Sequence, residues 1–219
     1  NLSVVKKNLL KTQAKFFIPY AGFFQEAAKR DTYIKKNNLK NSVSDYIKYL
    51  DEEVLDTTSY DEFLFNGTEF ISSQKITREQ SQTSPENFYK EIFLNCSLDE
   101  LEIKEYFVKS NFQDNLILYI ELTNDDFSNT EQMFSVNFSK DKPEVKFENF
   151  YWKKIKLENT SIMLNRKLHI KIRKDSFSWV INNKMPWEDL SIGFQCKIDR
   201  NPDIYNVEFW DHFTNNYIG

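Results

Sequence analysis

The chain has 219 residues, a formal net charge of -4 and an aromatic content of 16%. Its length is sufficient for one large domain or two small ones, and its 20 Phe and 11 Tyr exclude a disordered polar chain. The negative charge argues against general affinity for nucleic acid, and the sequence has no apolar run of about 18 residues that would span a membrane. We therefore expect a folded, cytoplasmic protein that has neither nucleic acid nor a membrane as a partner.

The N-terminal region has the pattern of an α/β fold. Residues 1–12 are expected to form a helix, and the apolar run 14–24 has the length of a strand that ends in a turn near Gly22. Helical spacing resumes after this turn, and Ser42 precedes a further helix as its N-cap. Strand followed by helices is typical of an α/β unit. Because the chain begins with Asn1 rather than Met, we expect a fragment or a processed product.

The polar stretch ISSQKITREQSQTSPEN, residues 71–87, has the composition of a linker or a long loop. It separates the α/β pattern from a region that is rich in strands. We therefore predict an N-terminal part over residues 1–70, a linker over 71–87 and a C-terminal domain over 88–219.

Helices followed by a succession of strands are predicted in the C-terminal domain. Pro85 and the capping-box sequence SLDE at Ser97–Glu100 each mark the start of a helix. Apolar alternation with short polar breaks then predicts a mainly antiparallel sheet. The expected strands are 115–123, 133–139, 145–150, 161–164, 168–173 and 190–198. With further helices from Asp175 and Asp203, the predicted fold class is α+β.

The run KLHIKIRK, Lys167–Lys174, is the clearest cluster of positive charge. Its alternation of basic and apolar residues predicts a half-buried strand with a solvated basic face. The alternative is a basic rim that attracts an anionic ligand.

The patterns of the common catalytic sites are missing from the sequence. Its two histidines, His169 and His212, and its two cysteines, Cys96 and Cys196, are isolated, so we expect structural histidines, reduced thiols and no metal site. No GxGxxG, P-loop or GxSxG motif occurs. The acidic sequences DEEVLD and TNDDF are expected to be a helix end and a turn. We therefore assign no catalytic residue.

Three blocks of sequence, in the same order and at similar separations, resemble the CMP-N-acetylneuraminate hydroxylase family. The first block is PYAGFFQEAAKRDTYIKKNNLKN at Pro19–Asn41. The second block joins LYIELTNDDF at Leu118–Phe127 to VNFSKDKP at Val136–Pro143. The third block runs from Trp187 to Phe213 and contains IGFQ, PDIY and FWDHF. The blocks cover about a third of the chain.

This resemblance implies a monooxygenase that hydroxylates the N-acetyl group of a CMP-linked sialic acid. It also implies a Rieske iron-sulfur domain and a metallo-β-lactamase-like fold, whose Cys/His and HxHxDH motifs are missing here. Residues 1–70 are then the C-terminal remnant of the metallo-β-lactamase-like α/β fold, followed by a mixed domain with a mainly antiparallel sheet and flanking helices. Such a chain is not catalytic alone, and iron and a Rieske cluster are expected only in a full-length relative.

The expected partners are the chain's own missing N-terminal part and a nucleotide sugar. One alternative is a non-catalytic ligand-binding or interaction module. The other is the C-terminal part of a different metallo-β-lactamase-fold enzyme.

Three candidate substrate contacts lie in the first block. In a metallo-β-lactamase-like fold the turn after a strand lies near the active-site edge, so Tyr20, Gly22 and Glu26 can line a pocket. Gly22 would admit a ligand close to the backbone, Tyr20 would stack or donate, and Glu26 would orient a hydroxyl. The structural alternatives are a turn at Gly22 and a helix N-terminus at Glu26.

Three more candidates lie in the third block. Gln195 is expected to bind an amide or a base edge, and Arg200 to grip a phosphate or a carboxylate with two hydrogen bonds. The structural alternative for Arg200 is an ion pair with Asp203. His212 is the weakest candidate, because the aromatic residues around it recur every four residues and are expected to form a core.

Overall fold

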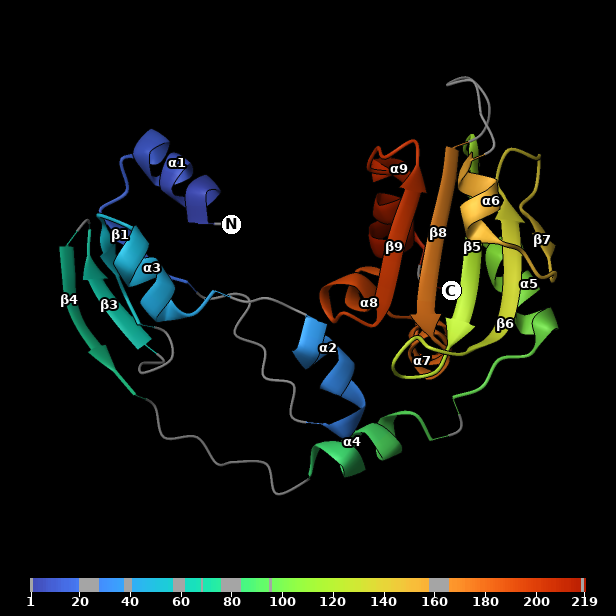
Figure 1. The fold of residues 1–219 in the computed structure, drawn as a ribbon, viewed down its shortest axis with the longest axis horizontal. Helices are drawn as coiled ribbons and strands as arrows, with labels where there is room; N and C mark the ends of the chain where they lie inside the picture. Colours follow the sequence, from blue (N-terminus) through green and yellow to red (C-terminus); the bar gives the residue numbers. More distant parts are fainter. Residues whose placement is uncertain are drawn as a thin grey trace. The chain divides into compact units, whose positions relative to one another are not determined.

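Figure 1 shows a computed structural model of the chain, which describes residues 2–19, 28–37, 41–56, 62–67, 69–75, 84–94, 96–157, 166–217 and 219. The chain divides into two compact units. The first contains residues 1–27 and 34–84, and the second contains residues 28–33 and 85–219. Helices and separate small sheets confirm the predicted α+β class. Within the described residues, no helix has the length and apolar character needed to cross a membrane.

The first unit has short helices and two two-stranded sheets. Its described elements are α1 (Leu2–Thr12), β1 (Phe16–Phe17), α3 (Val43–Tyr49), β2 (Glu53–Val54), β3 (Glu62–Asn66) and β4 (Glu69–Gln74). The residues of α2 (Thr32–Asn37) are divided between the two units, because the second unit includes residues up to 33. Strands β1 and β2 are parallel, and β3 and β4 form an antiparallel hairpin.

The predicted start of α3 is confirmed by its capping box. The Ser42 hydroxyl accepts a hydrogen bond from Asp45 N, and the Asp45 carboxylate accepts one from Ser42 N. The strand predicted over 14–24 is shorter within the described residues, where β1 contains only Phe16–Phe17. Its continuation from Tyr20 lies outside the described residues.

The second unit is built around a five-stranded sheet. Its elements are the 3-10 turn Lys29–Asp31, α4 (Pro85–Ile92), α5 (Glu100–Lys109), β5 (Leu116–Thr123), β6 (Thr130–Asn137), β7 (Glu144–Lys146), α6 (Trp152–Leu157), β8 (Arg166–Arg173), α7 (Lys174–Asn182), α8 (Glu188–Ile192), β9 (Cys196–Asn201), α9 (Val207–Asp211) and the π-helical turn His212–Asn216.

The strand order is β7-β6-β5-β8-β9. Pairing is antiparallel throughout except between β5 and β8, which are parallel. The mainly antiparallel sheet predicted from the sequence is therefore confirmed. The parallel pairing of its central strands β5 and β8 was not predicted. The sheet and its helices occupy the right-hand part of Figure 1.

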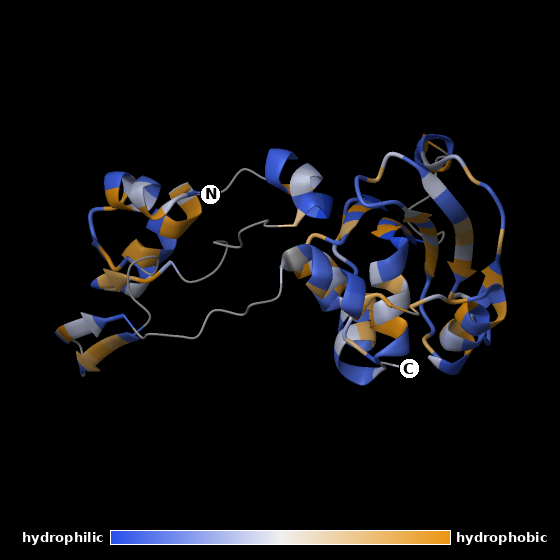
Figure 2. Ribbon diagram, turned by 90° about the horizontal axis from the view of Figure 1, so that it is seen from below, coloured by the Kyte–Doolittle hydropathy of each residue, from blue (hydrophilic) through white to orange (hydrophobic). Residues whose placement is uncertain are grey.

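Alternating residues of the central strands face a continuous apolar core. Leu118 and Ile120 of β5 are fully buried in this core with helical side chains such as Phe107 and Phe213. Trp187 lies among these rings, and its indole Nε1 donates to the Tyr106 hydroxyl at 2.8 Å. The helices in Figure 2 carry both hydrophilic and hydrophobic bands, as expected for helices with one face on a core.

The opposite face of the sheet is covered by a smaller, more polar layer. The ring of Trp152 in α6 stacks on His169 with 4.8 Å between centroids, and its Nε1 donates to Asp199 at 2.8 Å. His169 Nε2 lies 2.9 Å from a carboxylate oxygen of the buried Glu121, and the second oxygen is 2.9 Å from Lys171 Nζ. His169 thus has the structural role expected for it.

Two local predictions in this unit are wrong. The capping box before α5 is formed by Asp99 and Glu102 rather than by Ser97 and Glu100. The stretch 190–198 is not one strand: α8 ends at Ile192 and β9 begins at Cys196. Of the apolar residues in its alternating pattern, Leu190 is buried, whereas Ile192 is 66% exposed. Burial therefore follows the helical spacing of Trp187 and Leu190. The strand predicted at 161–164 lies outside the described residues.

Truncation of a core ring provides a test of this packing. Phe213→Ala is expected to lower the free energy of unfolding by about 3–5 kcal/mol, because the ring is fully buried and its removal leaves a cavity. Urea unfolding followed by tryptophan fluorescence measures the loss. The matched control is Phe88→Ala on α4, where the ring is half exposed and the expected change is within about 0.5 kcal/mol. Similar losses in both variants would contradict the assigned core.

The Glu121 pair predicts a dependence of stability on pH. Burial favours the neutral acid, but hydrogen bonds from His169, Lys171 and Thr130 outweigh it and lower the pKa of Glu121 from 4.5 to about 2. Because the folded-state pKa is depressed, the contribution is present above about pH 4.5 and is lost as the pH falls towards 2.

With allowance for screening, the contribution of Glu121 is about 1–3 kcal/mol. Glu121→Gln should therefore reduce the slope of unfolding free energy against pH between 4.5 and 2, measured by urea unfolding at stepped pH. An unchanged slope in this window would show that Glu121 ionises normally in the folded protein.

Candidate functional site

A polar cluster lies in the second unit where β5 and β8 end. Thr123 is opposite Arg173 in the parallel register, so the carboxyl ends of the two strands meet at one edge of the sheet. Ligands bind outside the carboxyl ends of parallel strands in many open sheets. We name the set of polar residues gathered here the Arg173 cluster, and its members are Arg30, Asp31, Tyr89, Asp125, Arg173, Asp175 and Gln195.

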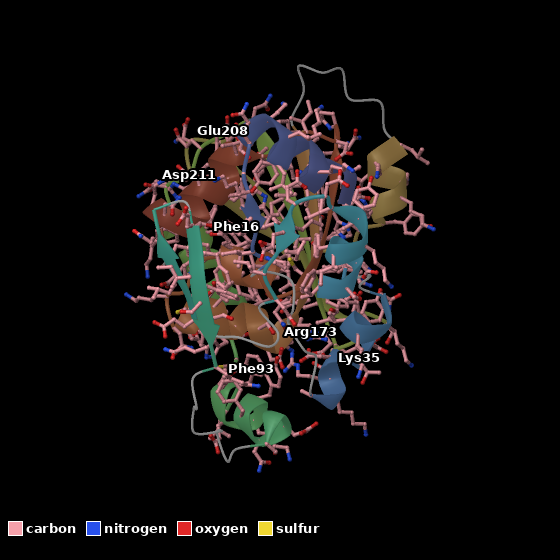
Figure 3. All side chains as sticks on the ribbon, turned by 90° about the vertical axis from the view of Figure 1, so that its left-hand side faces the viewer. Phe16, Lys35, Phe93, Arg173, Glu208 and Asp211 are labelled. Carbon is pink, nitrogen blue, oxygen red and sulfur yellow. The ribbon has the colours of Figure 1, made fainter. Side chains whose placement is uncertain are left out.

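Arg173, labelled in Figure 3, is fully buried and has four hydrogen-bond partners from three segments of the chain. Its Nη1 donates to Asp31 Oδ1 at 2.7 Å and to Gln195 Oε1 at 3.0 Å. Its Nη2 donates to the Arg30 carbonyl at 2.9 Å, and its Nε donates to the Asp125 carbonyl at 2.8 Å. A buried charge requires this degree of pairing, because an unpaired one would be strongly destabilising.

Arg30 is the second cation of the cluster. Its guanidinium makes two hydrogen bonds to the Asp175 carboxylate, at 2.6 and 2.9 Å, and lies 3.0 Å from Asp125 Oδ1. The rings of Tyr89 and Phe93 are 4.8 and 4.6 Å from its central carbon, so aromatic contacts accompany the ion pairs. Because Arg30 belongs to the segment 28–33, these contacts hold that segment within the second unit.

The protonation states follow from burial and from the surplus of carboxylates. Burial and the charge of Asp31 raise the pKa of Tyr89 from 10.0 to about 12, so its hydroxyl stays protonated and donates to Asp31 Oδ2 at 3.0 Å. Burial also raises the pKa of Asp125 above its ordinary value, although Arg30 and Arg173 oppose this shift. Three carboxylates face two guanidinium groups, which leaves no surplus positive charge for an anionic ligand.

A pocket of about 330 Å³ adjoins the cluster, lined by Cys96, Thr123, Asn124, Asp125, Glu131, Lys174 and Asp175. Lys174 is 3.0 Å from Glu131, so this cation is also paired. Burial, followed by the charge of Asp175, raises the pKa of the Cys96 thiol, which disfavours the thiolate needed for nucleophilic attack. The pocket can therefore accept hydrogen bonds from a ligand but has no activated cysteine.

The structure brings Gln195 into the cluster. Its side-chain oxygen accepts from Arg173 and from Ser176 Oγ at 3.1 Å, and its nitrogen donates to the Gly193 carbonyl at 2.7 Å. All of these partners belong to the same chain. Gln195 thus positions Arg173, and its role as a substrate contact stays a prediction.

The other candidates lie elsewhere. Arg200 Nε is 3.5 Å from Asp203, the alternative partner expected for it, and its guanidinium carbon is 5.7 Å from the centre of the Tyr205 ring. His212 Nε2 is 3.0 Å from the Ser110 carbonyl, and its ring stacks on Tyr217. Tyr20, Gly22 and Glu26 lie outside the described residues.

Sequence reasoning did not find the two arginines and Asp31. The run Lys167–Lys174 was expected to present a solvated basic face, but Lys167, His169 and Arg173 are buried. The available signal was the position of Arg173 at the end of an apolar strand, directly before the start of a helix. Its partner Asp31 is more than 140 residues away in the sequence, so spacing alone could not have joined them.

The described residues do not fit an iron site. They contain no group of three or more His, Cys, Asp or Glu side chains arranged to hold a metal ion. Both histidines have partners that suit structural roles, Glu121 for His169 and the Ser110 carbonyl for His212. We therefore assign no metal-dependent step to these residues.

Loss of the central cation provides a test of the cluster. Arg173→Met is expected to lower the free energy of unfolding by about 3–5 kcal/mol, because it leaves the Asp31 charge buried without its partner. Asp31→Asn removes the other charge of the same pair and leaves the buried Arg173 without its carboxylate. Urea unfolding measures the loss, and hydrogen exchange at the amides of 28–33 should accelerate.

The matched control is the neighbouring Lys174→Met. This lysine pairs with Glu131 at the surface, so its removal should cost at most about 1 kcal/mol and leave exchange at 28–33 unchanged. If the two variants behave alike, Arg173 does not hold that segment.

The three sequence blocks noted above meet at Arg173. Asp31 comes from the first block, the Asp125 carbonyl from the second and Gln195 from the third. The Phe127 ring, also from the second block, lies 5.5 Å from the guanidinium carbon. Segments that are far apart in the sequence thus form one environment.

Comparison with known proteins extends the resemblance to almost the whole chain. The chain is 30% identical over 240 residues to the cytidine monophosphate-N-acetylneuraminic acid hydroxylase of Sus scrofa, covering 95% of this chain and 50% of that protein. It is 26% identical over 235 residues to the hydroxylase of Danio rerio, covering 95% and 37%. It is 29% identical over 238 residues to the human protein named as an inactive hydroxylase, covering 95% and 43%.

The chain thus spans half or less of the length of these curated relatives. No family model matches it. A solved structure of sterol carrier protein 2 from Yarrowia lipolytica aligns with 59% of this chain and 92% of that chain, at 13% identity and a TM-score of 0.29. The resemblance inferred from three blocks is confirmed as similarity to the cytidine monophosphate-N-acetylneuraminic acid hydroxylases over 95% of the chain.

Proposed function

We propose that this chain is the non-catalytic C-terminal part of a cytoplasmic, iron-dependent oxygenase that acts on CMP-linked N-acetylneuraminic acid. The observation that carries the proposal is similarity to the curated hydroxylases over 95% of the chain. Residues 1–70 are then the end of a metallo-β-lactamase-like fold, and iron and a Rieske cluster belong to the part of the relatives that the chain does not cover. The second unit supplies a rigid scaffold and contacts to the nucleotide sugar.

Among the described candidates, Arg200 is the best suited to contact the substrate. Its distance of 3.5 Å to Asp203 is long for an ion pair, and the Asp203 side chain is 89% exposed. Surface pairs of this kind contribute at most about 1 kcal/mol, so a phosphate or carboxylate can replace Asp203 at little cost. Gln195 and His212 are bonded to their own chain and support the scaffold instead.

The alternative is a non-catalytic interaction module. Its support is that the described residues contain no metal-binding group and that the ions of the Arg173 cluster are paired with one another. On this alternative the chain folds as proposed but has no affinity for the nucleotide sugar.

Calorimetric titration of the chain with CMP-N-acetylneuraminic acid distinguishes these functions. We expect binding, a roughly tenfold loss of affinity in Arg200→Ala, and little change in the free energy of unfolding. Lys146→Ala, an exposed cation on β7 at the other edge of the sheet, is the control and should bind normally.

Mass spectrometry of the same mixture, with ferrous iron and a reductant added, should detect no product that has gained an oxygen atom. Such a product would contradict the non-catalytic assignment. No heat of binding would favour the interaction module.

A further inference from the structure

The outer edge of β9 carries backbone groups that can pair with another strand. β9 is the last strand in the order β7-β6-β5-β8-β9, and among the described residues it pairs with β8 alone. Figure 1 shows it at one side of the five-stranded sheet. The strand at the other edge, β7, has 3 residues, whereas β9 has 6, so β9 has the longer row of edge groups.

The register with β8 determines which backbone groups of β9 face outwards. Arg173 N donates to the Gln195 carbonyl at 3.1 Å, so these two residues form a hydrogen-bonded pair of the ladder. Hydrogen-bonded and non-hydrogen-bonded pairs alternate along an antiparallel ladder. Cys196, Ile198 and Arg200 are in non-hydrogen-bonded pairs and therefore direct their N–H and C=O groups away from β8.

The charges of β9 do not protect this edge against a second copy of the same strand. Edge strands often carry charged side chains, especially Lys, which hinder pairing with an approaching strand. In β9 the side chains of Lys197 and Asp199 lie on one face of the sheet, and their charges are opposite. Lys197 Nζ lies 4.0 Å from the centre of the Tyr33 ring and 4.6 Å from that of Phe127, and it has no carboxylate partner within the described residues.

A two-fold axis at Ile198 would bring these opposite charges together in an antiparallel pair of β9 strands. Lys197 of each copy is then opposite Asp199 of the other, in a non-hydrogen-bonded pair with about 4.5 Å between Cα atoms. Each Ile198 amide donates to the Ile198 carbonyl of the other copy, and each Cys196 amide donates to the other Arg200 carbonyl. An axis at Lys197 or at Asp199 would instead place two like charges directly opposite each other, which is destabilising.

Exposed apolar side chains lie at both ends of the strand. Phe194, just before β9, is 40% exposed, and Ile204, just after it, is 55% exposed. In an antiparallel pair the start of one strand lies beside the end of the other, so Phe194 of one copy approaches Ile204 of the second. Burial of these side chains adds apolar contact to the hydrogen bonds and the ion pairs.

We propose that two copies of this chain associate by antiparallel pairing of their β9 strands about a two-fold axis at Ile198, which joins the two five-stranded sheets. The partner is a second copy because the charge order of β9 is complementary to itself in this register. The contact is short, so we expect a weak dimer with a Kd of about 0.1 mM. The assignment is independent of the proposed function, since it requires no nucleotide sugar and uses only the carbonyl of Arg200.

Sedimentation equilibrium of the full chain, at concentrations from about 10 to about 500 µM around the expected Kd, measures the association. Lys197→Glu should weaken dimerisation at least about tenfold, because two carboxylates then oppose each other on both sides of the axis. Lys146→Glu makes the same charge change on β7, at the other edge of the sheet, and should leave dimerisation unchanged. A chain that stays monomeric over this range, or a dimer that Lys197→Glu does not weaken, would overturn the proposal.

A second substitution separates repulsion from misfolding. Adding Asp199→Asn to Lys197→Glu removes one of the two opposed carboxylates and keeps an oxygen that can accept from Trp152 Nε1. The double variant should therefore regain part of the lost affinity. No recovery in a variant whose circular dichroism matches that of the original chain would contradict the opposition of residues 197 and 199.

Disulfide trapping locates the contact. Ile198→Cys places two thiols opposite each other at the proposed axis, where a Cα separation of about 5.5 Å is within the range of a disulfide. Mild oxidation should yield a covalent dimer on a non-reducing gel. Leu101→Cys on α5 is the control, because this position is 63% exposed but distant in sequence from β9, and it should form far less dimer. Equal cross-linking of the two variants would show that the contact is not at β9.

Discussion

The burial of one charged group, the Arg173 guanidinium, constrains much of the second unit. An arginine cannot lose its proton to escape a low-dielectric environment, so the fold must supply acceptors on every side. It does so with Asp31, Gln195 and two backbone carbonyls, which come from segments before, between and after the central strands. The position of each of these segments is therefore tied to the position of a single side chain.

The parallel pairing of β5 and β8 explains why such a cluster can exist at this edge. In an antiparallel pair one strand would end where the other begins, and the residues following the two strands would be at opposite edges. Here the Asn124–Asn129 loop and the first turn of α7 leave the sheet at the same edge. Asp125 and Asp175 consequently face the same cation, Arg30, at 3.0 Å and 2.6 Å.

Much of the fold was predicted from the sequence because helix caps, helix starts and the alternation of apolar residues in strands each involve only neighbouring residues. The Ser42 cap, the helix from Pro85 and the alternating strands depend on residues within a few positions of one another, and the structure contains them. The stretch around Ile192 was misassigned because its alternation of apolar residues matched a strand while Trp187 and Leu190 were buried at helical spacing. The cluster itself was beyond local reasoning, since Arg173 and Asp31 show no mutual signal in one sequence. Gln195 was expected to bind an amide or a base edge, and its hydrogen bonds show a structural use.

The segment 28–33 determines whether the second unit can be separated from the rest of the chain by a single cut in the sequence. The chain passes from the first unit to the second at residue 28, returns at residue 34 and passes again at residue 85. A gene segment that began at Pro85 would thus encode every strand of the five-stranded sheet but not the carboxylate that neutralises its most deeply buried cation. Recombination at residue 85 would therefore transfer the five-stranded sheet with a buried Arg173 that lacks the Asp31 carboxylate. Selection should keep residues 28–33 and 85–219 together in one gene.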